Sequence, residues 1–163
     1  PMSDILCIYY SRTGNTKKAV EKIARELDAE VLELRDGVDR SGWRGFLRSR
    51  LEAIPRTTHP LKPVETHRPL KDYRLVIVAT PVWAGRCSSV VRAFLKEYGN
   101  TLPDAAYVVT RGSEEKSEEV YEQMDRYVPG GHVAAASLRV GAVGYAFWRE
   151  EFLRQVRDFL EQK

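Results

Sequence analysis

A run of hydroxyl, amide and glycine residues near the start of the chain has the chemistry of an anion-binding turn. It comprises Ser11, Arg12, Thr13, Gly14, Asn15 and Thr16. Gly14 can adopt a positive φ without steric cost, and a helix starting at about Asn15 would direct unpaired N–H groups toward the same point. Because the helix dipole also favours negative charge there, we expect an anion at this turn. A helix cap alone would need only one such side chain.

The segments on either side of this turn predict a buried strand and an amphipathic helix. Residues 5–10 are continuously apolar, which is typical of a parallel strand buried on both faces, and Cys7 is expected in the core. After the turn, Val20, Ile23 and Ala24 lie at helical spacing, with charged residues on the opposite side. The turn is therefore expected at the carboxyl end of the first strand.

The rest of the chain continues the alternation of strands and helices. Further strands are predicted over residues 30–34, 75–79, 105–109 and 133–140, the first of them near a sheet edge. Apolar stripes predict further helices over about 43–54, 91–98, 120–127 and 148–159, the second of these closed by Gly99. This pattern predicts an α/β fold with a doubly wound, five-stranded parallel sheet in the order 2-1-3-4-5 and helices on both faces. We expect residues 1–163 to form a single domain.

The segment between residues 36 and 74 is the least regular. Trp43, Phe46, Leu47, Leu51 and Ile54 form the apolar stripe of its helix, which Pro55 is expected to end. We interpret the arginines between positions 40 and 56 as a solvated face of this helix. Residues 56–69 resemble an extended connector, and His59 and His67 have no ligand partners at metal-binding spacing, so no metal site is expected.

Two polar loops follow the strands between which the predicted strand order reverses. The first is residues 11–16, and the second comprises Thr80, Pro81, Val82, Trp83, Ala84, Gly85 and Arg86. In open α/β sheets, ligands bind outside the carboxyl ends of the strands at such a reversal. The sequence therefore predicts a small-molecule site between these loops.

Several phosphate-binding chemistries lack their required residues in the first loop. A nucleoside-triphosphate hydrolase places a lysine before the Ser or Thr, but here Lys17 follows Thr16. A dinucleotide-binding unit has three spaced glycines, and this loop has only Gly14. A cysteine phosphatase places its nucleophile at the mouth of the loop, whereas Cys7 lies inside the strand. What remains is a phosphate held without metal or lysine, beside a loop that carries an aromatic residue.

Residues 11–16 resemble the Ser/Thr-x-Thr-Gly-Asn-Thr phosphate loop of flavodoxins, and residues 80–86 resemble the second loop that flanks the flavin in such proteins. The resemblance extends over the whole chain. It implies that the 5′-phosphate of FMN is held by the side chains of Ser11, Thr13, Asn15 and Thr16 and by the N–H groups of Arg12 and Gly14. Thr80 would bond the phosphate or the ribityl chain from the other side.

The resemblance also implies which residues line the isoalloxazine ring. They are Pro81, Val82, Trp83, Ala84 and Gly85, with Trp83 as the stacking partner, a contact worth about 0.5–1.5 kcal/mol beyond area burial. A core or dimer-contact tryptophan is the alternative for Trp83. The third loop lacks the tyrosine that many flavodoxins place there, so Arg111, Gly112 and Ser113 are expected to contribute only backbone contacts, and the outer flavin face is open or covered by another segment.

Two uses of a bound flavin stay open. One is a single-electron carrier that docks a redox partner protein, which we rank first because no added nicotinamide-binding segment is evident. The other is an enzyme that takes hydride from NAD(P)H and reduces a quinone or another small-molecule electron acceptor. A flavin-free binding module is a third interpretation.

The charged residues bear on the flavin and its partners. Arg86 and Arg111 belong to loops expected beside the ring, where one charge at about 6 Å is worth roughly 3 kcal/mol before screening and would give the flavin a higher hydroquinone potential than that of acidic, low-potential flavodoxins. The alternative is that Arg111 points to solvent or pairs with Glu114. No catalytic acid, base or nucleophile stands out. Cys87 is either a partly activated thiol or a small residue that fills a helix start.

Composition narrows the cellular context. The net charge of +3 is the small difference between 26 basic and 23 acidic residues. This near balance argues against a nucleic-acid binder. No stretch is long and apolar enough to cross a bilayer, and no leader pattern begins the chain, so we expect a cytoplasmic protein without a membrane role. The sequence leaves a homodimer open.

Overall fold

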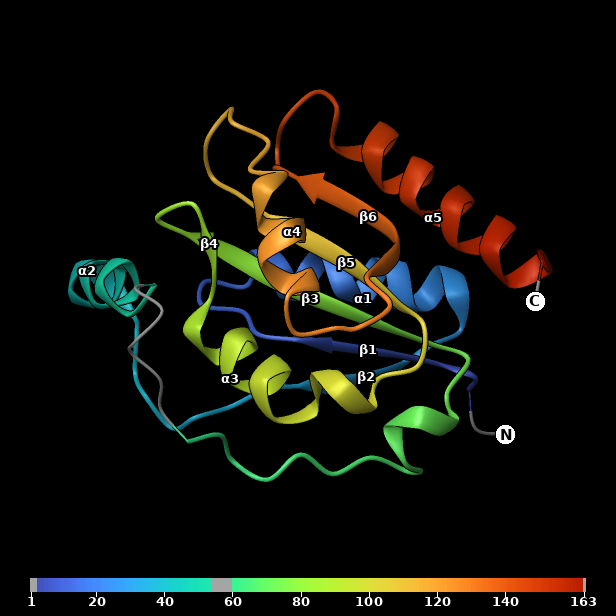
Figure 1. The fold of residues 1–163 in the computed structure, drawn as a ribbon. Helices are drawn as coiled ribbons and strands as arrows, with labels where there is room; N and C mark the ends of the chain where they lie inside the picture. Colours follow the sequence, from blue (N-terminus) through green and yellow to red (C-terminus); the bar gives the residue numbers. More distant parts are fainter. Residues whose placement is uncertain (1–2, 54–59, 163) are drawn as a thin grey trace.

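The computed structural model describes residues 3–53 and 60–162 and has a parallel sheet between two layers of helices (Figure 1). The strands, in spatial order, are β2 (Glu30–Glu33), β1 (Ile5–Tyr9), β3 (Leu75–Trp83), β5 (Ala105–Thr110) and β6 (His132–Leu138). A short strand, β4 (Arg86–Cys87), pairs antiparallel with the end of β3, outside this path. The predicted order 2-1-3-4-5 is confirmed, since β5 and β6 are the fourth and fifth predicted strands.

The helices cover both faces of the sheet, as predicted. The helices α1 (Asn15–Leu27) and α5 (Tyr145–Gln162) pack on one face, and α3 (Ser89–Tyr98) and α4 (Glu119–Asp125) pack on the other. Alternate residues of β1 serve the two cores: Leu6 and Ile8 face α3 and α4, whereas Cys7 and Tyr9 face α1 and α5. The core position expected for Cys7 is confirmed.

The strand β3 is longer than the sequence predicts. It continues beyond Ala79 to Trp83, because Val82 and Trp83 pair with Cys87 and Arg86 of β4. The intervening residues, Ala84 and Gly85, both have positive φ, 50° and 75°, as the tight turn of a hairpin requires. Residues 80–86 thus form a β-hairpin with the end of β3 and not an open loop.

The helix α2 (Gly42–Glu52) packs with the side opposite to its apolar stripe. Trp43 is 69% exposed and Leu51 is 67% exposed, whereas Gly45, Ser49 and Glu52 are buried. A Cβ at Gly45 would lie 1.6 Å from the carbonyl oxygen of Arg40, so only glycine permits this close approach. Ile54 and Pro55, where the sequence predicts the end of this helix, lie outside the described residues.

Gly99 ends α3 differently from the predicted cap. Its φ is −55°, and the chain continues into a 3₁₀ turn over Gly99–Thr101. A Cβ at this position would lie 2.2 Å from the carbonyl oxygen of Tyr127, so glycine is required by a close backbone approach and not by a left-handed conformation.

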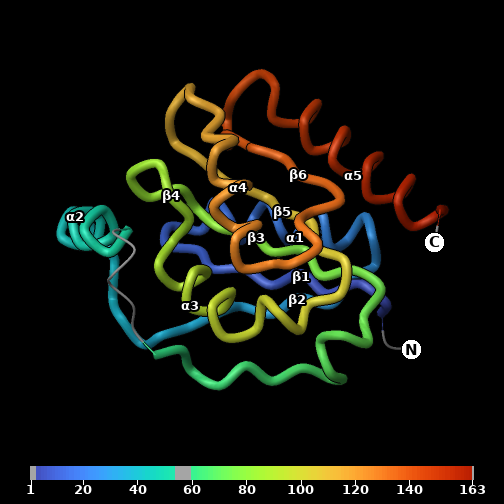
Figure 2. The backbone as a smooth tube through the Cα atoms, viewed as in Figure 1, coloured from blue at the N-terminus to red at the C-terminus, as the bar shows by residue number. Residues whose placement is uncertain are grey.

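The described part of the predicted connector, residues 60–69, runs in extended form along the β2 side of the sheet (Figure 2). The N–H of Lys62 donates to the carbonyl of Arg35 at 2.7 Å, and Leu61 and Val64 pack against the core. A 3₁₀ turn at Leu70–Asp72 then leads into β3. His59 lies outside the described residues. None of the described helices combines the length and apolar composition needed to cross a membrane.

Candidate functional site

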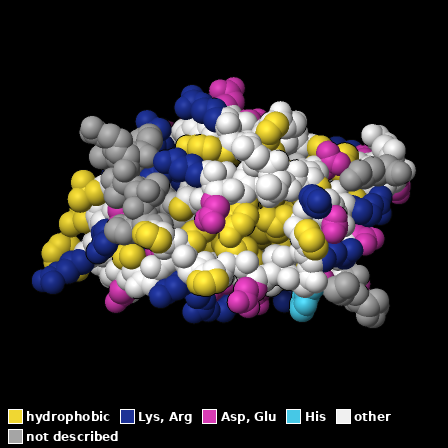
Figure 3. Space-filling view, turned by 60° about the horizontal axis from the view of Figure 1, so that its bottom comes forward, with side chains coloured by type: hydrophobic (Ala, Val, Ile, Leu, Met, Phe, Trp, Pro, Cys, Tyr) yellow, Lys and Arg dark blue, Asp and Glu magenta, His cyan; other side chains and the backbone are white. Residues whose placement is uncertain are grey.

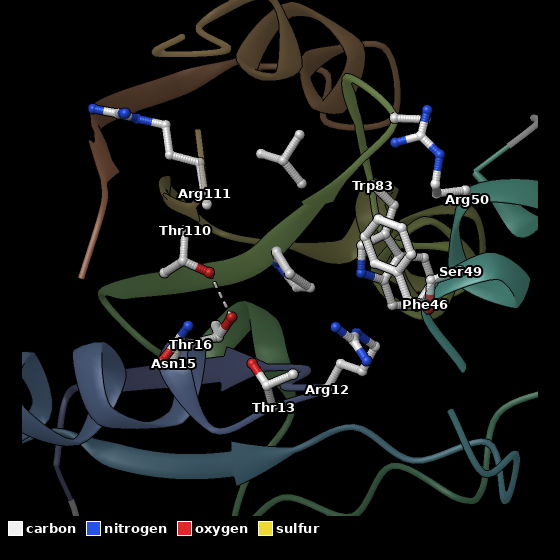
Figure 4. Close-up of a pocket in the computed structure, with 14 residues that line it drawn as sticks. Arg12, Thr13, Asn15, Thr16, Phe46, Ser49, Arg50, Trp83, Thr110 and Arg111 are labelled. Atoms are coloured by element: carbon white, nitrogen blue, oxygen red, sulfur yellow. Dashed lines mark hydrogen bonds between the residues drawn. The ribbon is translucent and has the colours of Figure 1, made fainter. Parts of the chain in front are cut away.

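A pocket of about 210 Å³ lies at the carboxyl ends of β1, β3 and β5, where the strand order reverses (Figure 4). Its lining comes from the loops after these three strands and from α2. The lining residues are Arg12, Thr13, Asn15, Thr16, Phe46, Ser49, Arg50, Pro81, Val82, Trp83, Ala84, Thr110, Arg111 and Gly112. Segments that lie as much as 100 residues apart in sequence therefore meet at the position that the strand order predicts.

The first loop forms a tight turn beside this pocket. Gly14 has a φ of +97°, and its N–H donates to the Ser11 hydroxyl at 3.0 Å. The helix α1 begins at the next residue, and its first turn, which is fully described, holds no acidic side chain. The N–H groups at the start of α1 and its dipole therefore favour an anion at the base of the pocket.

A buried hydroxyl pair joins the first and third loops. Thr16 is 2% exposed, and its Oγ1 lies 2.6 Å from Oγ1 of Thr110 (Figure 4). The two residues are 94 positions apart in sequence. This contact holds the start of α1 against the end of β5, so that the floor of the pocket is fixed from both sides.

Ten of the fifteen residues that the sequence selects as cofactor-binding line the pocket, and five do not. Ser11 and Gly14 hold the first turn together through the hydrogen bond between them, and neither lines the pocket. Thr80 is fully buried: its hydroxyl donates to the carbonyl of Pro81 and accepts from the N–H of Ser88. The structure therefore does not bring the Thr80 hydroxyl to the pocket. Gly85 and Ser113 also lie outside the lining set.

Trp83 lines the pocket but is more buried than the sequence predicts. It is 5% exposed, and its ring stands edge-on to Tyr10 with centroids 5.6 Å apart. The guanidinium carbon of Arg40 lies 5.3 Å from the Trp83 ring centroid. Since Arg40 and Tyr10 both pack against the indole, a ligand in the pocket could contact only its small exposed part.

Arg40 is the centre of a buried ionic cluster that holds α2 beside the pocket. Its side chain is fully buried, and it donates to Glu52 at 2.7 and 2.8 Å and to Asp36 at 2.8 and 3.0 Å. Burial acts to lower the pKa of Arg40, but hydrogen bonds to Asp36, Tyr10 and Glu52 outweigh it and raise that pKa above its ordinary value. The guanidinium therefore stays charged, and both carboxylates are compensated.

The helix α2 contributes to the site, which the sequence did not predict. Phe46 is 49% exposed, and its ring lies 5.9 Å from the guanidinium carbon of Arg12 and 5.8 Å from that of Arg50 (Figure 4). One sequence signal was available: Glu52 is the only acidic residue between Arg40 and Pro60. A single carboxylate in so basic a helix indicates a buried partner and hence the inward face.

Of the two arginines that the sequence places in loops beside the ring, Arg111 lines the pocket and Arg86 does not. Arg111 donates to the Ser137 hydroxyl at 2.9 Å and to the Ser113 carbonyl at 2.6 Å, and its guanidinium points away from the pocket (Figure 4). Arg86 lines a separate cavity with Arg92. Of the two expectations for Arg111, the structure agrees with a guanidinium that points away from the ring position, and its partners are Ser137 and Ser113 and not Glu114. Arg12 and Arg50 also line the pocket.

Cys87 has the properties of a small structural residue. It is 3% exposed, and burial raises the pKa of its thiol to about 11, against the opposing effect of Arg92 and Arg86. A thiol with that pKa is protonated at neutral pH and is a weak nucleophile. Within residues 3–53 and 60–162, no three His, Cys, Asp or Glu side chains gather as a metal site would require.

Comparisons with known proteins relate the chain to flavoproteins by structure alone. No protein-family model and no curated protein sequence matches it. A candidate flavoprotein from Bacteroides uniformis has a TM-score of 0.74 at 18% identity, covering 96% of this chain and 99% of that one. A flavoprotein in complex with FMN from Lactobacillus acidophilus has a TM-score of 0.65 at 20% identity, over 91% and 99% of the two chains.

A third similar structure is the flavodoxin, WrbA-like protein from Agrobacterium tumefaciens, with a TM-score of 0.62 at 14% identity over 99% of both chains. At these identities the likeness shows the fold, which is flavodoxin-like.

Proposed function

We propose that this chain, with its flavodoxin-like fold, binds FMN and transfers electrons. The observation that carries the proposal is the meeting of three loops in one pocket at the strand reversal, with an anion-binding turn as its base. The FMN complex of the similar Lactobacillus acidophilus protein supports the choice of ligand. FMN supplies one-electron and two-electron chemistry, and the chain supplies binding, orientation and electrostatics.

The described residues suit the two ends of FMN. The turn at residues 11–16 and the start of α1 would hold the phosphate, with Thr13 and Thr16 lining that part of the pocket. Trp83 and Phe46 offer aromatic surface for the ring, and Phe46 is a candidate for the covering residue that the third loop lacks. Since closed pockets for drug-sized ligands are usually larger, about 300–1,000 Å³, part of the flavin would stay accessible for electron exchange.

Titration of the flavin-free protein with FMN and with riboflavin tests this proposal, because the two ligands differ only in the phosphate. Thr13 is exposed, so Thr13→Glu adds a negative charge at the turn without disturbing the core. We expect this variant to weaken FMN binding by at least about tenfold and riboflavin binding much less. Thr13→Gln is the neutral control of similar size and should retain most of the FMN affinity.

Two results would contradict the proposal. One is equal loss of FMN and riboflavin affinity in Thr13→Glu, which would place the phosphate elsewhere. The other is a purified protein that is colourless and gains no thermal stability from added FMN, which would favour a flavin-free binding module instead.

We rank a carrier that docks a redox partner protein above an NAD(P)H-dependent quinone reductase. The arginines beside the pocket, Arg12 and Arg50, are the specific observation in favour of the reductase, because guanidinium groups bind the phosphates of a dinucleotide. Steady oxidation of NADPH by the pure protein with benzoquinone would reverse the order.

Both cysteines are free thiols, as suits a reducing compartment such as the cytoplasm.

A further inference from the structure

One side of α2 exposes an unusual number of large apolar side chains. Trp43 and Leu51 are 69% and 67% exposed, and Phe46 and Leu47 are each 49% exposed. Single exposed hydrophobic residues are ordinary, but four on one helix of 11 residues form a contiguous patch of the kind that marks an interaction site. We call these four residues, together with Arg44, Arg48 and Arg50, the α2 face.

The packing of the opposite side holds the α2 face outward. Glu52 is bound to the buried Arg40, and Gly45 lies against the backbone of residue 40. Arg92 donates to the carbonyls of Glu52 and Ala53, at 2.9 and 3.0 Å, and so fixes the end of the helix. Turning the apolar side inward would break these buried interactions, so the exposure is built into the fold.

The charge on the α2 face is of one sign and one residue type. Every Lys or Arg position from 36 to 61 is an arginine, and the carboxylate of Glu52 is only 5% exposed. The guanidinium of Arg44 lies 5.4 Å from the Trp43 ring, and that of Arg50 lies 5.8 Å from the Phe46 ring. Guanidiniums stacked on aromatic rings lose little freedom when they bind carboxylates in bidentate fashion.

Figure 3 shows hydrophobic side chains with Lys and Arg side chains among them at the end of the molecule where Figure 1 places α2. The face is continuous with the pocket, since Phe46 and Arg50 belong to both. A protein bound there would cover the rim of the pocket and bring its own surface close to a ligand inside. The position therefore suits a partner that exchanges electrons with that ligand.

We propose that the α2 face docks a redox partner protein whose own docking surface is acidic around an apolar centre. That the partner is a redox protein rests on the proposed function, whereas the docking of a protein at this face does not. A symmetric contact with a second copy would oppose arginine to arginine, with Glu52 already engaged. Aromatic residues and arginine in place of lysine are characteristic of protein interfaces, which favours a protein over a membrane surface.

Binding of two redox proteins of opposite charge tests the proposal. An acidic [2Fe–2S] ferredoxin and a basic c-type cytochrome serve as probes, titrated calorimetrically against the full chain without and with FMN. We expect the acidic probe to bind and the basic probe not to bind, with affinity falling as salt rises from about 50 to 200 mM. Because the flavin-free arm needs no FMN, failure of docking and failure of FMN binding are distinguishable.

Variants on the α2 face that do not line the pocket locate the contact. Trp43→Ser/Leu47→Ser and Arg44→Glu should each weaken binding of the acidic probe by roughly tenfold or more. The matched control, Phe147→Ser/Arg25→Glu, replaces an exposed aromatic residue on α5 and an exposed arginine on α1. It should change binding of the acidic probe by less than about twofold.

Three results would overturn the proposal. The first is absence of binding to the acidic probe at low salt, or equal binding by the α2 variants. The second is a dimer of the parent protein in sedimentation that is absent in Trp43→Ser/Leu47→Ser, since the face would then join two copies. The third is co-flotation with phosphatidylglycerol vesicles, lost in the same variant, without binding to the acidic protein.

Discussion

The helices α1 and α2 both flank the pocket and both carry an apolar stripe, but α1 buries its apolar side and α2 buries the opposite side. In α1 the stripe of Val20, Ile23 and Ala24 is buried against the sheet. In α2 the stripe points outward, and the buried residues are Gly45, Ser49 and Glu52. An apolar stripe is therefore buried only where the fold offers it an apolar surface.

The surroundings of the two helices explain the difference. The strands β1 and β3 present Cys7, Tyr9, Leu75 and Ile77 to α1, and each large side chain buried there contributes about 1.5–3 kcal/mol. Figure 1 places α2 beyond the carboxyl ends of the strands, where the fully buried guanidinium of Arg40 must be compensated by carboxylates. A buried ion pair adds little net stability, but loss of one partner is costly.

Removal of the guanidinium that anchors α2 should have the largest effect. Arg40→Ala leaves Asp36 and Glu52 as buried carboxylates without their common partner, and we expect a loss of about 3–5 kcal/mol. Because the anchor is local to α2, hydrogen exchange should show amides of α2 losing protection before those of α1. Equal loss of protection in both helices would contradict a local anchor, and Arg25→Ala, an exposed arginine on α1, is the control.

A matched pair of leucine-sized truncations compares the two stripes directly. Ile23→Ala, at 1% exposure in α1, should cost about 2–5 kcal/mol in the free energy of unfolding. Leu47→Ala, at 49% exposure in α2, should change it by less than about 0.5 kcal/mol. Urea denaturation measures both. A cost above about 2 kcal/mol for Leu47→Ala would mean that the α2 stripe packs against the protein.

Alkaline pH should weaken the core beneath α1 while leaving the α2 anchor charged. Burial raises the pKa of Cys7 from 9.0 to about 12, so the folded state keeps a proton that the unfolded chain releases. That contribution is complete below pH 9 and is lost as pH rises toward 12, roughly 2–3 kcal/mol by pH 11. The pKa of Arg40 is raised, so its ion pairs persist over this range.

The measurement is the free energy of unfolding at pH 8, 9, 10 and 11 for the parent protein and for Cys7→Ala. The variant should lose less stability across this range, because tyrosines and Cys87 contribute equally to both proteins. Parallel curves for the two proteins would show that Cys7 does not titrate differently in the folded and unfolded states.

Local sequence patterns were enough to predict the strand order, the buried strand that leads into the turn at residues 11–16, and the meeting of the loops after β1 and β3. These features depend on local periodicity and on chain connectivity, which a single sequence displays. The turn also needed no long-range information, since Gly14 and the following helix start are neighbours in the chain.

Tertiary contacts set which side of α2 is buried, bring Phe46 and Arg50 to the pocket, and turn Arg111 away from it. Each depends on a partner distant in sequence: Glu52 for Arg40, 12 residues away, and Ser137 for Arg111, 26 residues away. Periodicity states which side chains share a face of a helix. It does not state which face is inward, because a buried charge requires its partner before it can leave water.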